Sequence, residues 1–224
     1  MRVGIVVFLI GCGRVGFDEV DLSTASSEQP RLVHQTAVLD TGATATAEFE
    51  PTTRGDLLVV ATVGISTSSH VIAVGDDAND TFVSAGATDM CNDRTVGEVW
   101  YTTAGSIAAT NLTVSASVSD DREVWVLELV GVDELDQIAT IDNTAAAATV
   151  DAPIVTPSQL PAIVLSQIND PAEIGSLVTP GFLALPDLHG DDAAYAVVTT
   201  PGDYGARWLN DTDGLYCGFT AAFH

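Results

Sequence analysis

The sequence has no lysine, and its seven basic residues are all arginine. Against these stand 31 aspartate and glutamate residues, which give a formal net charge of -24 at pH 7. A chain this acidic repels nucleic acid phosphates and anionic membrane surfaces, so we expect no nucleic acid partner. Hydrophobic residues make up 46% of the chain, which excludes a disordered polymer and predicts a packed core under a solvated acidic surface.

Long hydrophobic runs are also missing, because no stretch approaches the roughly 20 apolar residues that span a bilayer. The apolar run at residues 3–11 has nine residues and follows Arg2, which suits the core of a signal peptide. It ends in Leu9-Ile10-Gly11-Cys12, the pattern that a lipoprotein-processing peptidase recognises. We therefore predict a signal peptide at residues 1–11 and lipid attachment at Cys12. Acyl chains on this cysteine would hold the exported protein at the outer membrane or cell surface.

The same region offers a competing interpretation, because GCGRVG at residues 11–16 fits the G-x-G-x-x-G loop that binds dinucleotides. That loop requires a helix directly after it. Asp18, Glu19 and Asp21 would place three carboxylates where the phosphate should bind, and no helical apolar stripe follows. We therefore expect no nucleotide ligand and interpret residues 12–34 as an acidic, serine-rich tether.

The rest of the chain, residues 35–224, has the pattern of short strands. TNLTVSASVS alternates between apolar and polar residues, as a half-buried antiparallel strand does. Solid apolar runs in GDLLVVATVGI, REVWVLELVGV and LPAIVLSQI favour central strands, and Gly-, Asp- and Pro-containing turns separate them. The sequence predicts an all-β, two-sheet antiparallel β-sandwich or jelly roll of about eight or more strands.

A loose internal repeat supports this architecture. PTTRGDLLVVATV resembles TPSQLPAIVLSQI, and VWVLELV resembles LYCGFTA. Between these pairs, EVWYTTAGSIAATNLTV is echoed by AAYAVVTTPGDYGARW. We therefore expect two halves of four strands each within a single domain.

The order of motifs from GDLLVV through EVWYTTAG and VWVLELVGVD to AYAVVTTPGDYGARW and a closing AAF resembles a known domain family. This β-sandwich domain is widespread in secreted bacterial proteins, and the resemblance covers about residues 35–224. The family accompanies extracellular modules and carries no catalytic motif, which implies a structural or interaction role. The N-terminal CGRVGFD is similar to the start of many bacterial lipoproteins.

Three cysteines occur, at Cys12, Cys91 and Cys217. Lipidation of Cys12 would leave an even pair, and export would permit a Cys91–Cys217 disulfide. Closing so long a loop would stabilise the fold by about 4–5 kcal/mol. Cys217 also falls on an apolar face with Phe219, where a buried free thiol is common. We predict the disulfide.

Two acidic turns are the candidate calcium sites. One contains Asp76, Asp77, Asn79 and Asp80, and the other contains Asp211 and Asp213 before Gly214. Neither has the D-x-[DN]-x-[DN]-G spacing of a calcium loop, whereas Asp and Asn also stabilise turns by bonding to their own backbone. We expect no cofactor, and calcium is the alternative.

Catalytic motifs are absent from the sequence. His34, His70, His189 and His224 lie far apart without metal-ligand spacing, and no G-x-S-x-G motif occurs. Five aromatic residues could build a sugar-stacking platform, although aromatic residues on strands usually belong to the core. They are Trp100, Tyr101, Trp125, Tyr204 and Trp208.

The sequence thus predicts a non-enzymatic, membrane-anchored module that interacts with a surface protein or glycan. A carbohydrate-binding sandwich assisted by calcium is the first alternative. A jelly-roll hydrolase or lyase acting on polysaccharide is the second.

Overall fold

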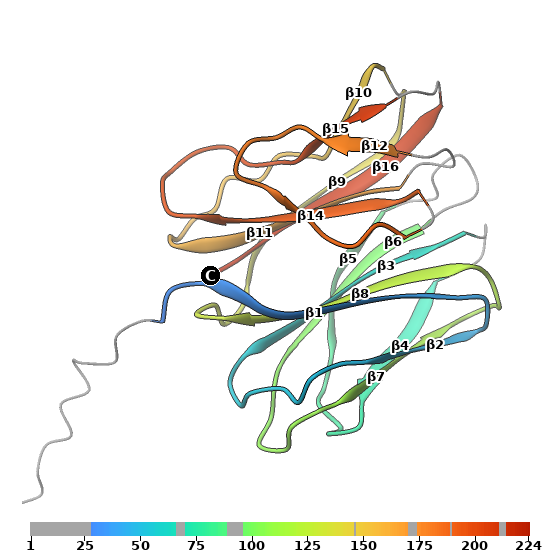
Figure 1. Cartoon of the computed structure of the whole chain (residues 1–224), viewed down its shortest axis with the longest axis vertical. Coiled ribbons are helices and arrows are strands. Elements are labelled where there is room, and N and C mark those ends of the chain that lie inside the picture. Colours follow the sequence, from blue (N-terminus) through green and yellow to red (C-terminus); the bar gives the residue numbers. More distant parts are fainter. Residues whose placement is uncertain are drawn as a thin grey trace, which may run out of the picture.

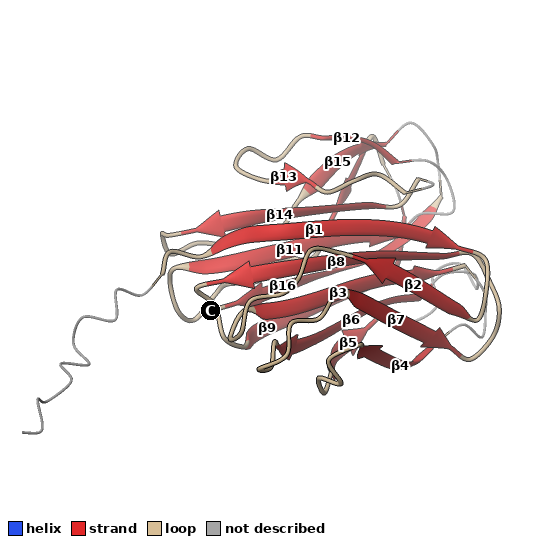
Figure 2. Cartoon of the chain, turned by 60° about the horizontal axis from the view of Figure 1, so that its bottom comes forward, coloured by secondary structure: helices blue, strands red, loops and turns tan. Residues whose placement is uncertain are grey.

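A computed structural model describes residues 28–65, 70–88, 96–145, 147–169, 174–188, 190–210 and 214–224. The predicted signal peptide and most of the predicted tether lie outside these residues, as do Cys12 and Cys91. Within the described ranges all regular secondary structure is β-strand, and Figure 2 shows strands joined by loops throughout. No helix in the described ranges is long and apolar enough to cross a membrane.

The described residues up to Val130 contain eight strands, which make up the first half of the fold. They are β1 (Arg31–Asp40), β2 (Thr44–Glu48), β3 (Leu57–Gly64), β4 (Val71–Asp76), β5 (Val83–Ala87), β6 (Val96–Thr103), β7 (Asn111–Ala116) and β8 (Arg122–Val130). Five of them form an antiparallel sheet in the order β1-β8-β3-β6-β5. The other three form a second sheet in the order β2-β7-β4.

The second half repeats this topology strand for strand. Its strands are β9 (Leu135–Ala145), β10 (Thr149–Asp151), β11 (Ala162–Asn169), β12 (Ile174–Leu177), β13 (Leu183–Ala184), β14 (Asp192–Val198), β15 (Arg207–Asn210) and β16 (Leu215–Phe223). They form a five-stranded sheet β9-β16-β11-β14-β13 and a three-stranded sheet β10-β15-β12. Each strand of the first half therefore has an equivalent in the second half whose number is higher by eight, so that β1 corresponds to β9 and β8 to β16.

The predicted all-β antiparallel sandwich class is confirmed, and the internal repeat coincides with equivalent strands. The repeated segments contain β3 and β11, β6–β7 and β14–β15, and β8 and β16. Within the described residues each half has eight strands in two sheets, however, where the sequence suggested four strands per half and two sheets in all. The difference arises because strands as short as β10 and β13 are too brief to show an alternating pattern.

The four sheets stack as layers, with the first half below and the second half above in Figure 1. The two five-stranded sheets face each other in the middle, and each three-stranded sheet covers one outer side. On β3, Val59 faces the other half while Leu58 and Val60 face the sheet of their own half. Because both faces are buried, this strand appears in the sequence as an unbroken apolar run.

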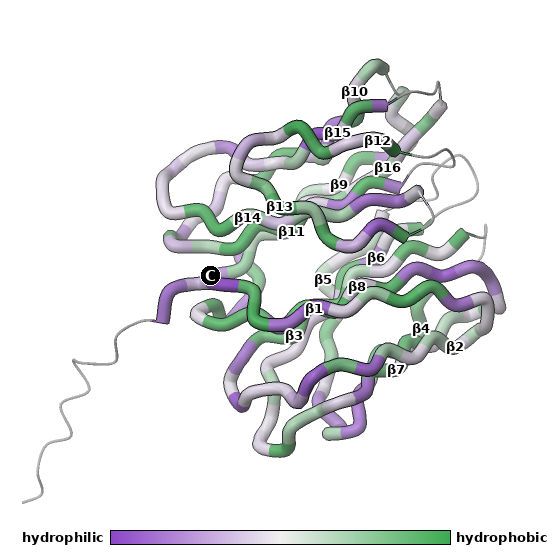
Figure 3. The backbone as a smooth tube through the Cα atoms, in the orientation of Figure 1, coloured by the Kyte–Doolittle hydropathy of each residue, from purple (hydrophilic) through white to green (hydrophobic). Residues whose placement is uncertain are grey.

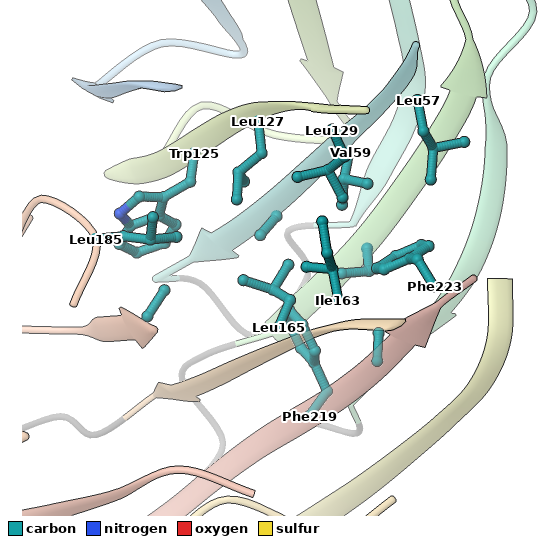
Figure 4. Packing of buried hydrophobic residues seen from close by; sticks show 14 of the residues in the cluster. Leu57, Val59, Trp125, Leu127, Leu129, Ile163, Leu165, Leu185, Phe219 and Phe223 are labelled. Carbon is teal, nitrogen blue, oxygen red and sulfur yellow. The ribbon is translucent and has the colours of Figure 1, made fainter. Parts of the chain in front are cut away.

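The contact between the halves is a shared hydrophobic core. Figure 4 shows Trp125 and Leu127 of the first half opposite Ile163 and Leu165 of the second. The Trp125 indole Nε1 donates a hydrogen bond to the Pro186 carbonyl oxygen at 2.8 Å, which holds the loop before β14 against β8. Figure 3 shows hydrophobic stretches along the central strands, with hydrophilic residues at many turns and strand ends. The halves are thus joined through the largest faces of both sandwiches.

Candidate functional site

Cys217 is fully buried on β16, on the face that packs against the first half, and it is disulfide-bonded. Its predicted partner, Cys91, lies outside the described residues, so the Cys91–Cys217 pairing stays a prediction. Cys12 lies outside them as well, and its lipidation also stays a prediction.

In the first acidic turn, an aspartate side chain accepts hydrogen bonds from backbone nitrogens of the turn itself. The Oδ1 atom of Asp76 accepts hydrogen bonds from the backbone nitrogens of Ala78 at 3.1 Å and Asp80 at 2.9 Å. Asn79 adopts the left-handed backbone conformation, with φ of 62°, that such a turn requires. Asp80 in turn accepts a hydrogen bond from the Gly105 nitrogen at 3.0 Å. These contacts support the structural interpretation of this turn, whereas Asp211 and Asp213 lie outside the described residues.

The neighbouring Asp77 fastens this turn to β7. It accepts bonds from the Thr110 backbone nitrogen at 2.8 Å and the Thr110 hydroxyl at 2.7 Å. The Asn111 amide side chain adds a further bond to Asp77 at 3.2 Å. Hydrogen bonds from Thr110 and then Asn111 hold the pKa of Asp77 well below its usual range.

The aromatic residues do not form the suggested platform. Trp125 and Trp208 are only 1% exposed and belong to the core, so a stacking surface built on all three tryptophans is excluded. Trp100 and Tyr101 are half-buried, and the Tyr101 ring packs edge-on against Phe223 with centroids 6.1 Å apart. The contribution of these side chains is therefore mainly to packing.

Three histidines each pair with a different glutamate. His70 Nδ1 lies 3.3 Å from Glu98 Oε1, and His224 Nε2 lies 3.6 Å from Glu134 Oε1. His34 Nδ1 lies 2.6 Å from Glu128 Oε2. The three pairs involve different segments of the chain, and His189 lies outside the described residues.

The pair formed by His34 and Glu128 belongs to a larger cluster that the sequence did not reveal. The other Glu128 oxygen accepts a bond from the Thr53 backbone nitrogen at 2.6 Å. Asp56 lies near Glu128, and burial followed by this carboxylate raises the pKa of Asp56 to about 6. The contacts join β1, β8 and the turn before β3, and pattern reading cannot link residues so far apart in the chain.

A hollow of about 430 Å³ lies on the outer side of the second half. Its walls include Ile154, Val178 and Pro180, and Gly205 is among the residues between them. Arg207 forms an ion pair with Asp151 at its edge. Beyond Pro180, which belongs to both, lies a second hollow of about 190 Å³. We call the two hollows together the outer groove.

Backbone and hydroxyl contacts hold the wall of the outer groove in place. The Val178 nitrogen donates to the Arg207 carbonyl at 2.8 Å, and the Arg207 nitrogen donates to the Thr179 hydroxyl at 2.7 Å. In the second hollow the Tyr204 hydroxyl donates to the Thr200 carbonyl at 2.6 Å. The groove is therefore preformed, as small binding sites usually are.

Exposed apolar side chains are concentrated in the part of the chain that forms this groove, and three of them, Ile154, Val178 and Val197, line it. Five of the nine large hydrophobic residues that are exposed in the described part of the chain lie between β10 and β15. They are Ile154, Val178, Leu183, Val197 and Leu209. Ile154 is 63% exposed and lies on the wall of the larger hollow, beside the exposed Val178. The sequence showed no signal for this site beyond the P-G turn at residues 180–181, because the groove forms between segments that are distant in the chain.

These features define a tandem antiparallel β-sandwich whose second half carries a preformed surface groove. Compared with known proteins, the chain matches no family model, no curated protein and no solved structure. The resemblance to sandwich domains of secreted bacterial proteins accordingly stays a prediction.

Proposed function

We propose that the chain is an exported lipoprotein, anchored through Cys12, and that its tandem sandwich is a non-catalytic module that binds a segment of another protein. The outer groove is the binding surface in this proposal. The observation that carries it is the exposure of Ile154 and Val178 on the walls of a preformed hollow.

The chemistry of the groove favours an extended peptide with an aliphatic side chain. Such a side chain would remove apolar surface of Ile154, Val178 and Pro180 from water, which favours binding. At the edge, Arg207 can donate hydrogen bonds to peptide carbonyls and Asp151 can accept them from peptide amides. A sugar ring would instead favour an exposed aromatic face. The larger hollow has only aliphatic residues, small residues and the charged pair along its lining, and the two aromatic residues of the second hollow, Phe182 and Tyr204, are buried and half-buried.

Membrane anchoring and export rest on the N-terminal sequence. The apolar run, the small residue before Cys12 and the serine-rich segment after it are the features that support the anchor. The acidic body would be repelled by anionic lipid headgroups, so the lipid alone would provide the attachment.

The groove is tested with a substitution pair matched for residue type and exposure. Ile154→Asp places a charge on the groove wall, and Ile72→Asp places one on β4, where the isoleucine is 65% exposed. We expect an array of extended peptides with aliphatic residues to contain ligands whose affinity falls about tenfold or more in I154D. The same ligands should bind I72D as they bind the unmodified protein.

Binding of polysaccharides in a parallel panel, with no peptide bound, would contradict the proposed partner class. Equal loss of peptide affinity in I154D and I72D would contradict the proposed location.

A further inference from the structure

One end of the contact between the two halves is polar rather than apolar. Glu123 on β8 and both Gln167 and Asn169 on β11 are completely buried, and Asp191 before β14 is 3% exposed. Glu123 is two residues from Trp125 and Gln167 is two residues from Leu165, so strand alternation directs both toward the shared core. We call Glu123, Gln167, Asn169 and Asp191 the polar layer.

The strand registers bring these side chains to the same end of the sheets. In the first half Val63 pairs with both Glu123 and Gly97, so the three form one row across the five-stranded sheet. The Asn169 amide nitrogen of the second half lies 2.6 Å from the position that a Cβ would take on Gly97. Asn169 therefore packs directly against that row, in space that only a glycine leaves open.

The loop before β14 adds carboxyl groups to the layer. Asp192 pairs with Ile168 on β11, so Asp191 stands beside Asn169 at the end of the same sheet. The hydrogen bond from Trp125 to Pro186 holds this loop close to β8. Burial, and after it the carboxyls of Asp191, Asp187 and Asp192, raise the pKa of Glu123 to about 9.

The contacts of two members of the layer are incomplete within the described part of the chain. Both carboxyl oxygens of Glu123 and both amide atoms of Gln167 are buried there without a hydrogen-bond partner. Native proteins leave few buried polar atoms unpaired, and each such atom calls for an ion, a water molecule or a proton. Nor does any ion pair among the described residues join Glu123 to a basic side chain.

We propose that the polar layer binds a divalent cation, and that calcium suits it best. The Glu123 carboxylate and the Gln167 amide oxygen supply donors from opposite halves, and Asn169 and Asp191 stand at the same end of the sheets, Asp191 close enough to act on the Glu123 carboxyl. A cation would satisfy buried oxygens and neutralise neighbouring carboxylates at once, whereas water does only the first. It would also link the two halves at the end where their shared core is polar.

The donor set separates calcium from softer metals. All four side chains offer oxygen, which hard cations prefer, and none offers sulfur or imidazole nitrogen. No three His, Cys, Asp or Glu side chains in the described ranges form a metal-holding group by themselves. The amide oxygens and bound water are therefore essential to the coordination, and calcium accepts such mixed shells more readily than magnesium.

The test uses the full chain after treatment with a chelator. Thermal unfolding with calcium chloride at about 100 times Kd should raise Tm by about 5 °C or more, and magnesium should raise it less. Terbium provides a direct readout, because its emission should be sensitised by the nearby Trp125 and suppressed by added calcium. A chain that shows neither a calcium-dependent Tm shift nor terbium emission would overturn the proposal.

Two variants locate the site, and a third is the control. Glu123→Gln removes the charge and Gln167→Met removes the oxygen, and each should abolish the calcium shift and the terbium emission. Glu98→Gln changes another buried glutamate of the same sheet, one that already accepts a bond from the Val71 nitrogen at 2.8 Å, and it should keep both signals. If E123Q does not fold, Q167M decides alone. Calcium binding that survives in Q167M would overturn the assignment.

Discussion

At the scale of single residues, the most informative side chains are carboxyls whose surroundings differ sharply. Hydrogen bonds hold the pKa of Asp77 well below its usual range, whereas burial and then Glu128 raise the pKa of Asp56 to about 6. The sequence does not distinguish these residues, because both are aspartates in turns next to apolar strands. Their difference comes from the fold, which brings Glu128 of β8 to the turn before β3.

Asp56 gives the protein a defined dependence of stability on pH. Its pKa of about 6 in the folded state exceeds the ordinary 3.8, through burial and Glu128 and to a lesser degree Glu28, against the opposing effect of Arg31. Its contribution to stability is therefore complete below the unfolded pKa and is lost as the pH rises through about 6.

Titration of Asp56 lowers the free energy of unfolding of the unmodified protein as the pH rises from about 4 to about 7. We expect this fall to be about 2 kcal/mol smaller in Asp56→Asn, measured by urea unfolding at each pH. Glu48→Gln, on an exposed position of β2, should leave the pH slope unchanged. An unchanged slope in D56N would show that this carboxyl is not the titrating group.

At the scale of secondary structure, the strands that the sequence predicted best are those whose burial pattern is simplest. β3 and β11 are buried on both faces and appear as apolar runs, and β7 alternates cleanly because only one of its faces is buried. β10 and β13 have three and two residues, too few for any period to be visible.

The polar layer escaped prediction for a related reason. Glu123 and Gln167 lie inside strands that are otherwise strongly apolar, and in a linear pattern they look like solvent-facing exceptions. Their burial results from the packing of one five-stranded sheet on the other, which no local sequence pattern specifies. The outer groove was missed on the same grounds, since Ile154 and Val178 come together only through β15.

The shared core makes a prediction about the central strands. Leu165 on β11 is 1% exposed between the halves, and Leu165→Ala should destabilise the protein by about 3 kcal/mol and lower Tm by about 6–12 °C. Leu183→Ala on β13, where the leucine is 59% exposed, should change Tm little. Calorimetry should show one transition in both variants, and two separate transitions in L165A would mean that the halves fold independently.

At the scale of the whole molecule, two eight-stranded halves of identical topology have different surfaces. The second half carries the outer groove with most of the exposed large hydrophobic residues of the described chain, and the contact between the halves carries the polar layer. The two halves thus share one topology, and the second half bears the proposed binding surface. The start of β1 lies near the carboxyl end of the protein (Figure 1).

Mass spectrometry of the N-terminal peptide from membranes of producing bacteria determines whether lipid on Cys12 holds the exported module to a membrane. We expect the mature chain to begin at Cys12 and to carry diacylglycerol. We also expect Cys12→Ala to release the protein from the membrane fraction, whereas Ser23→Ala in the same segment should not. A chain that keeps residues 1–11 with an unmodified Cys12, recovered in the soluble fraction, would contradict the proposed lipid anchor.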